Sequence, residues 1–183
     1  MQKGIKKIVY CAMLIAFAVV IKLFLGIPII TEGVYAISIS LAPAIIIFAG
    51  MLLGPVYGGI AGFVTDILTN LIRPIGPYMP QFSLTMALYG ILGFLFYTYL
   101  LKNKKIKSFP KMLIISSILQ VLLSIVLNTY FLVQVNQVPL FALLPMRLLN
   151  AGISAPVFAF VLYVFEKLGN KIFTEKFALQ KST

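Results

Sequence analysis

The chain has 183 residues, of which 61% are hydrophobic and only 10% are charged, with a formal net charge of +11. A soluble domain of this size carries far more charge, so the composition excludes a soluble globular protein and indicates a single-domain, multi-pass membrane protein. The sequence contains no histidine and one cysteine, Cys11, which excludes an internal disulfide and removes the commonest metal ligand and general base.

Long apolar runs predict an all-α integral membrane protein in which six transmembrane helices form one domain over residues 1–183. The first run follows a basic N-terminus and lacks a small-residue cleavage site, so we expect a retained helix rather than a signal peptide. The second run is short and broken by Pro43, so it either crosses the membrane with little tilt or lines a cavity rather than facing lipid. The predicted spans are about 5–27, 38–53, 55–72, 82–101, 111–134 and 143–166, and residues 167–183 form a predicted cytoplasmic tail.

Most lysines lie on one side of the predicted spans, and this asymmetry sets the orientation of membrane proteins. Both termini and the connector between the fourth and fifth spans are therefore predicted to be cytoplasmic. We attribute the basic connector to this topology and to contact with anionic lipid, not to nucleic-acid binding. The residues on this side are Lys3, Lys6, Lys7, Lys102, Lys104, Lys105, Lys107, Lys111, Lys167, Lys171, Lys176 and Lys181.

The third predicted span holds the main candidate for a binding site, because it carries an acid, Asp66, about midway along its length. Placing a carboxylate at the centre of a membrane helix costs about 2.5–3.5 kcal/mol, so such residues are rare and mostly functional. The alternative is a structural role, in which Asp66 only hydrogen-bonds a neighbouring helix. Asn70 follows one turn later, and Arg73 marks the predicted outer end of the span.

Other polar residues are predicted at similar depth, in the outer half of the membrane. Lys22 on the first span either contributes to a site or extends its long side chain to the membrane interface. Arg147 on the sixth span begins a polar stripe with Asn150 and Ser154, which favours a site there. Asn128 on the fifth span joins this group. Together these residues predict a binding cavity that opens to the outside and is closed towards the cytoplasm.

Small residues at four-residue spacing allow helices to approach closely within membranes. Gly58 and Gly62 provide this spacing on the third span, and Ala12 and Ala16 provide it near the cytoplasmic end of the first span. Taken alone, such stripes indicate packing within the chain more often than a partner surface. A further stripe on the sixth span comprises Ala151, Ala155 and Ala159.

Catalytic motifs are absent from the sequence. It has no phosphate-binding loop, no nucleophile elbow and no cluster of residues with metal-ligand spacing. The lack of histidine and of paired acids also disfavours a membrane enzyme. We therefore expect no cofactor and no metal, and any energy for active transport must come from a partner or an ion gradient.

Six short predicted spans with both ends inside, the stripe of Ala12 and Ala16 and the outward-facing cavity resemble the S components of energy-coupling factor (ECF) vitamin transporters. Residues 53–68, 73–94 and 143–157 are most similar to the folate-specific S component. The resemblance covers nearly the whole chain. It implies a subunit in the bacterial cell membrane that captures a vitamin outside and docks on a transmembrane coupling protein driven by two cytoplasmic ATPases. It also implies that Ala12 and Ala16 meet the coupling protein.

The residue chemistry is compatible with folate as the vitamin. A pterin edge presents adjacent N–H donors that the Asp66 carboxylate can accept, and the glutamate tail carries carboxylates that Arg147, Arg73 or Lys22 can bind. We favour Asp66 for the ring and Arg147 for the tail, and the rival interpretation is an Asp66–Arg147 ion pair that only closes the bundle. Side chains predicted to stack on the flat rings are Tyr35, Tyr78 and Phe82.

Two alternatives to folate binding stay open. The same fold could serve another heterocycle, such as thiamine, riboflavin or a queuosine precursor, because related S components share the glycine-rich third span. The chain could also be a structural or assembly protein of the membrane that binds no small ligand. In the transporter interpretation, we expect residues 28–37 and 73–82 to close the site, since glycine and proline punctuate both segments.

Overall fold

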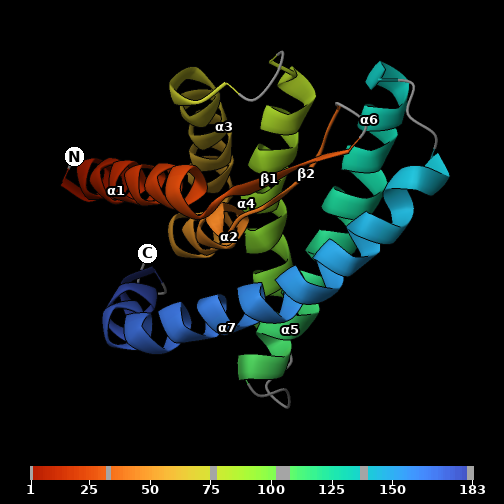
Figure 1. Cartoon of the computed structure of the whole chain (residues 1–183). Coiled ribbons are helices and arrows are strands. Elements are labelled where there is room, and N and C mark those ends of the chain that lie inside the picture. The colour runs from red at the N-terminus through yellow and green to blue at the C-terminus, as the bar shows by residue number, and fades with distance from the viewer. Residues whose placement is uncertain (1, 32–33, 75–77, 102–107, 137–139, 181–183) are drawn as a thin grey trace.

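The computed structural model describes residues 2–31, 34–74, 78–101, 108–136 and 140–180, which form a helical protein with one β-hairpin (Figure 1). Helices α5, η1 and α6 follow one another without a break, and η1 is a π-helix. The elements are α1 (Gln2–Leu25), β1 (Ile27–Thr31), β2 (Val34–Ile39), α2 (Ala42–Leu53), α3 (Pro55–Ile72), α4 (Pro80–Leu101), α5 (Ser108–Leu119), η1 (Gln120–Leu127), α6 (Asn128–Asn136) and α7 (Leu140–Gln180).

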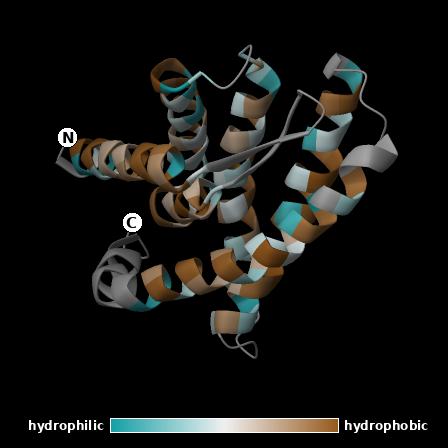
Figure 2. Cartoon of the chain, viewed as in Figure 1, coloured by the Kyte–Doolittle hydropathy of each residue, from teal (hydrophilic) through white to brown (hydrophobic). Residues whose placement is uncertain are grey.

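Five helical segments in the described part of the chain are long and apolar enough to cross a membrane. Hydrophobic residues cover most of their length (Figure 2). Large side chains such as Phe24 and Leu71 are exposed on the outside, as expected for a surface that faces lipid. The prediction of a helical protein with several apolar helices of membrane-spanning length is therefore confirmed, although the chain is not purely α because it includes the hairpin β1–β2. The segments are Gly4–Leu25, Pro55–Ile72, Pro80–Tyr99, Ser108–Gln134 and Arg147–Lys167.

The second predicted span is the short helix α2, which begins at Ala42 rather than at residue 38 because Val34–Ile39 form strand β2. Its twelve residues extend for about 18 Å at the α-helical rise, too little to cross a hydrocarbon layer of about 30 Å. Ten of the twelve are buried, which suits a sequence that is apolar on all sides. Pro43 fits because the first helical turn needs no N–H from that position.

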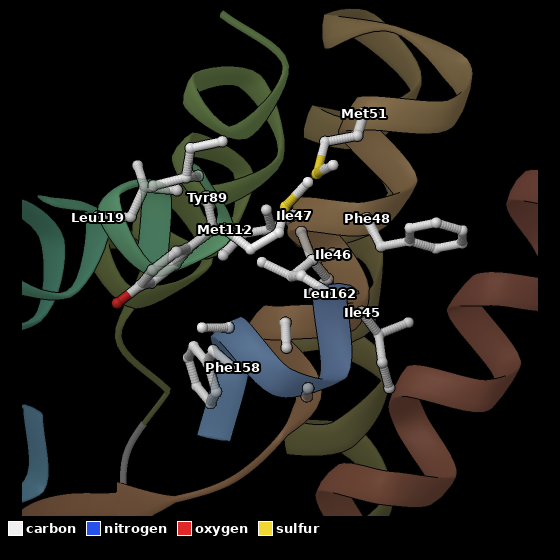
Figure 3. Packing of buried hydrophobic residues seen from close by; sticks show 14 of the residues in the cluster. Ile45, Ile46, Ile47, Phe48, Met51, Tyr89, Met112, Leu119, Phe158 and Leu162 are labelled. Atoms are coloured by element: carbon white, nitrogen blue, oxygen red, sulfur yellow. The ribbon is translucent and has the colours of Figure 1, made fainter. Parts of the chain in front are cut away.

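Helix α2 lies at the centre of the hydrophobic core. Figure 3 shows Ile45 and Ile47 of α2 packed among side chains of the surrounding helices, including Met112 of α5 and Leu162 of α7. All four of these side chains are almost completely buried. The core thus joins the N-terminal half of the chain to α5 and α7, and it fixes where the polar residues of α3, α4 and α7 lie.

The β-hairpin occupies part of the segment predicted as a polar loop between the first two spans. β1 and β2 are antiparallel, with Ile27 opposite Ile39 and Thr31 opposite Val34. The hairpin extends from the end of α1 in the direction of α6 (Figure 1), and β2 contacts α7. Of the two segments predicted to close the site, residues 32–33 and 75–77 lie outside the described residues, as do the connector residues 102–107.

Glycines bring α2, α3 and α4 into backbone contact. Gly50 of α2, Gly58 of α3 and Gly90 of α4 lie against one another, and a Cβ atom on any of them would collide with a neighbouring backbone. Gly62 of α3 lies equally close to the backbone of Met86. The prediction of close helix packing through Gly58 and Gly62 is confirmed, and this packing sets the distance between Asp66 on α3 and the polar residues of α4.

We expect Gly90→Ala to lower the melting temperature of the detergent-purified protein, because its Cβ would strike the backbone of Gly58. Overpacking a tight site costs about 1–3 kcal/mol, and here no flexible side chain can move aside. Gly152→Ala on α7 is the matched control, since nothing lies within 4 Å of the added Cβ. Equal melting temperatures for the two variants would contradict this account of the packing.

Helix α7 is long and contains two prolines, Pro145 and Pro156, each of which removes one backbone hydrogen bond from the helix interior. It extends to Gln180 and so continues into the predicted tail. Its alanine stripe faces inwards, as the packing interpretation of the sequence requires. The buried residues of this stripe are Ala151, Ala155 and Ala159.

Candidate functional site

Asp66 lies on the inward face of α3, with only 3% of its surface exposed. Its carboxylate accepts hydrogen bonds from side chains of three helices. Lys22 Nζ of α1 lies 2.5 Å from Oδ1, Ser83 Oγ of α4 lies 2.7 Å from Oδ2, and Asn70 Nδ2 of α3 lies 3.2 Å from Oδ2. The carboxylate therefore joins α1, α3 and α4 at one point.

The sequence explains how these groups come together. Asp66 and Asn70 are four residues apart on α3, so their side chains share one face of the helix. Ser83 lies in the first turn of α4, which packs closely against α3, and Lys22 lies in the last turn of α1. Tyr78 extends the network to the surface, because its hydroxyl lies 2.8 Å from Ser83 Oγ while its side chain is exposed. We call these five residues the Asp66 cluster.

The charge of Asp66 is balanced by Lys22. Among the described residues, these two side chains form the one ion pair found. The predicted rival pair between Asp66 and Arg147 is therefore wrong, since the cation at the carboxylate comes from α1. Lys22 also does not extend to the membrane interface, because its ammonium turns inwards to Asp66. A buried ion pair repays its desolvation only when further hydrogen bonds complete it, and Asn70 and Ser83 supply these here.

The Asp66 cluster is suited to an organic ligand with a hydrogen-bonding edge. A carboxylate has about four acceptor positions, of which three are filled, and the Lys22 ammonium has three donors, of which one is used on Asp66. An acceptor and donors thus lie side by side at this point. Within the described ranges, no three His, Cys, Asp or Glu residues group closely enough to hold a metal ion.

Arg147 lies in a second polar region, where α7 crosses η1. The side chain is 4% exposed, and its Nη1 donates a hydrogen bond of 2.7 Å to the backbone carbonyl of Ser124. Asn150, one turn further along α7, accepts a hydrogen bond of 2.8 Å from Ser154. The polar stripe of α7 thus faces the interior, but the structure does not join it to Asp66 by a direct bond.

Arg73 is exposed at the end of α3 and donates a 3.2 Å hydrogen bond to the carbonyl of Leu23 in the last turn of α1. Cations near a helix C-terminus stabilise the carbonyls that have no partner within the helix. Arg73 therefore ties the end of α3 to the end of α1, the helix that carries Lys22. Arg73 lies at the edge of the Asp66 cluster, and the structure gives it no direct bond to Asp66.

Asn128 lies where η1 meets α6, and its Oδ1 atom is buried with no hydrogen-bond partner in the described part of the structure. Phe82 is half-buried in the first turn of α4, next to Ser83. Tyr35 pairs with Ile30 across the hairpin, and its side chain lies outside the described structure. Ala12 and Ala16 are both exposed on α1.

A sequence model of the S component of ECF-type riboflavin transporters matches residues 2–172, which is nearly the whole chain. The chain belongs to the ECF S component family. It is 30% identical over 173 residues to the folate transporter FolT of Clostridium novyi (strain NT), covering 93% of this chain and 94% of that one.

Solved structures of S components have the same fold. A crystal structure of FolT bound with folic acid superposes with a TM-score of 0.73 at 29% identity, covering 93% of this chain and 98% of that one. The S component of a bacterial ECF transporter superposes with a TM-score of 0.59 over 97% of this chain and 99% of that one. At 21% identity, the second structure supports the fold alone.

Three polar residues of this S component were not assigned to the site from the sequence. Ser83 binds Asp66 directly, and Thr65 and Thr129 each bury a hydroxyl oxygen that has no hydrogen-bond partner among the described residues. Unsatisfied polar atoms are rare in protein interiors and require an explanation such as a ligand. The available signal was a hydroxyl within an apolar span, but serine and threonine often bond their own helix backbone, so the signal is weak.

Proposed function

We propose that this S component binds folate at the outer side of the membrane and delivers it to an ECF transporter. The observation that supports this most strongly is the likeness to FolT, which extends over nearly the full length of both chains and includes a structure bound with folic acid. The family model is described as a riboflavin transporter S component, so riboflavin is the second candidate. The two vitamins differ in charge, because folate carries a glutamate tail with two carboxylates.

The Asp66 cluster is the proposed site for the pterin ring. A pterin edge presents N–H donors beside a carbonyl acceptor. The open acceptor position of Asp66 matches a donor of this edge, and a free N–H of Lys22 matches its carbonyl. Ser83 and Asn70 hold the carboxylate in its orientation, so the pair is ordered before the ligand arrives.

Arg147 is the proposed partner of the glutamate tail, because a guanidinium binds a carboxylate with two parallel hydrogen bonds. Asn128, Thr65 and Thr129 are proposed to bond the ligand as well, since each has a buried oxygen without a partner in the described residues. Tyr78 and Phe82 lie beside Ser83 and are proposed to contact the flat rings, as is Tyr35 from the hairpin.

The proposed orientation places both termini and the 102–111 connector in the cytoplasm, with a cavity that opens outwards. The distribution of lysine supports it, because twelve of the fifteen basic residues lie on the proposed inner side. The Asp66 cluster then lies towards the outer surface, from which the vitamin arrives.

The proposed partners are a transmembrane coupling protein and two cytoplasmic ATPases in a bacterial plasma membrane. The family supports this, because energy-coupling factor transporters divide binding and ATP hydrolysis between subunits. Ala12 and Ala16 are the proposed contact on this chain. They are exposed and one turn apart on α1, and small side chains let a partner helix approach closely.

We expect the detergent-purified chain, expressed alone, to bind folic acid tightly with one site per chain. The measurement is a fluorescence or calorimetric titration with folic acid, riboflavin and thiamine in parallel, together with the optical spectrum of the purified protein. A co-purified pterin in that spectrum would add support. Tight binding of riboflavin or thiamine in place of folic acid would retain the transporter class and reject folate. Absence of binding to any of them by folded protein would favour a structural role.

A further inference from the structure

The π-helix η1 makes two polar contacts to neighbouring helices, about one turn apart. Gln120 Oε1 accepts a 3.0 Å hydrogen bond from the Tyr89 hydroxyl of α4, and the Ser124 carbonyl accepts the bond from Arg147 of α7. Tyr89 and Gln120 are as deeply buried as Arg147. In Figure 3 the Tyr89 ring lies in the hydrophobic core, and its hydroxyl points away from the α2 residues.

A π-helix of eight residues needs support from outside the helix. Such helices are rare, and most are single turns within an α-helix. In η1 the N–H of Asn128 bonds the carbonyl of Leu123, five residues earlier. In an α-helix the hydrogen bonds would join residues four apart instead of five, so each turn would be shorter. The Ser124 carbonyl would then rotate away from Arg147. The Tyr89–Gln120 bond holds the first turn of η1 against α4 and so opposes such a change.

The two polar contacts of η1 lie four residues apart, at Gln120 and Ser124, so they belong to one stretch of the helix. An arginine buried at membrane depth requires defined hydrogen-bond acceptors, because no water is present to replace them. The Ser124 carbonyl of η1 is one of these acceptors, so the position of this carbonyl contributes to the direction of the guanidinium. Tyr89 and Gln120 do not bond Arg147 in the structure, but they fix the segment that does.

We propose that Tyr89 and Gln120 are positioning residues for Arg147, and that they thereby set the preference of the site for a ligand with a carboxylate tail. The proposal rests on the proposed function, in which Arg147 binds the glutamate tail of folate. It assigns to the π-helix the task of keeping the guanidinium in one orientation. A ligand without the tail makes no contact with the guanidinium, so its affinity does not depend on this orientation.

The test compares folic acid with pteroic acid, the same molecule without its glutamate. For the isolated full-length protein, we expect folic acid to bind more tightly than pteroic acid, and Arg147→Gln to abolish this difference. Tyr89→Phe and Gln120→Met should each reduce the ratio of the two dissociation constants at least about tenfold, mainly through weaker folic acid binding. Binding of pteroic acid should change less than about threefold.

Tyr97→Phe is the matched control. Tyr97 also lies on α4, nearer its C-terminal end than Tyr89, and it is 6% exposed. Its hydroxyl donates a 3.3 Å hydrogen bond to the Glu166 carboxylate of α7. This variant loses the same atom at similar burial, so it reports the effect of a lost hydroxyl on the helix bundle. We expect it to leave the ratio unchanged. An equal fall in the ratio for Tyr97→Phe would overturn the proposal.

The remaining outcomes separate the inference from the function on which it rests. If Arg147→Gln abolishes the difference but Tyr89→Phe and Gln120→Met retain it, the positioning role is rejected and the folate assignment stands. If the wild-type protein does not distinguish the two ligands, the tail assignment and the inference both fail. Should either single variant fold poorly, the double variant removes both partners and leaves neither group unsatisfied. Its ratio then decides: a wild-type ratio overturns the proposal, and a reduced one supports it.

Discussion

We expect Asp66→Asn to weaken folic acid binding by at least about 30-fold and up to about 4,000-fold. Truncating one partner of a buried, hydrogen-bonded charge pair costs about 2–5 kcal/mol, and each 1.4 kcal/mol is a factor of ten in affinity. The amide that replaces the carboxylate leaves the Lys22 ammonium without its counter-ion and turns one acceptor into a donor. The measurement is the dissociation constant of folic acid for the purified variant.

Glu166→Gln is the control for this prediction, because Glu166 is also a buried carboxylate that accepts a hydrogen bond from a side chain. It lies in the region of Tyr97 and outside the proposed site, so we expect wild-type affinity. The double variant Lys22→Met/Asp66→Leu tests folding separately, since replacing a buried ion pair by apolar residues is often neutral for stability. A double variant that folds and does not bind would support the site. Wild-type affinity of folded Asp66→Asn would assign Asp66 a purely structural role.

Asp66 was identifiable from the sequence because an acid within an apolar span is costly to bury. Such residues are therefore rare and mostly functional. Its partner was not identifiable. Lys22 is 44 residues away on another helix, and two other cations were equally available: Arg147 on the sixth predicted span and Arg73 at the end of the span that carries Asp66. Periodicity shows which residues share a face of one helix, but it does not show which helices are neighbours. The pairing emerges only after α1 is placed against α3.

The β-hairpin had a signal that the sequence interpretation passed over. Ile27–Thr31 and Val34–Ile39 are rich in β-branched residues, and only two residues separate the two runs, as in a hairpin. We predicted a loop with the second span starting at residue 38. An apolar run directly before a helix cannot be distinguished from the helix by its pattern alone. The strands shorten α2, and burial on all sides then makes this short helix the centre of the core.

The π-helix could not be predicted from its residues. The stretch from Gln120 to Leu127 is apolar apart from Gln120 and Ser124, and it resembles any other membrane helix. Its polar contacts are made with Tyr89 and Arg147, which lie on other helices, and the residues of the stretch do not show these contacts. The glycine contacts of α3 were predictable, by contrast, because close approach requires a small residue whichever helix is the neighbour.

The second large effect concerns the exposed surface of α1. We expect Ala16→Trp to lower ATP-dependent folic acid uptake about 5- to 150-fold while folic acid binding by the isolated chain stays unchanged. Ala12 and Ala16 are exposed between larger exposed residues such as Met13 and Phe17, so a partner helix can approach closely only at the alanines. An indole at this point costs about 1–3 kcal/mol of overpacking, which corresponds to that range of fold-changes.

The control for this variant is Val157→Trp, which places the same indole on the exposed face of α7. Both variants are assayed in membranes that contain the coupling protein and both ATPases, with folic acid binding to each purified chain measured alongside. The proposed contact requires uptake to fall for Ala16→Trp alone. Equal loss in both variants would indicate a general effect of an added indole on the membrane-embedded bundle. Parallel loss of binding and uptake in Ala16→Trp would show that α1 acts through Lys22 and the Asp66 cluster, and the partner surface would then lie elsewhere on the chain.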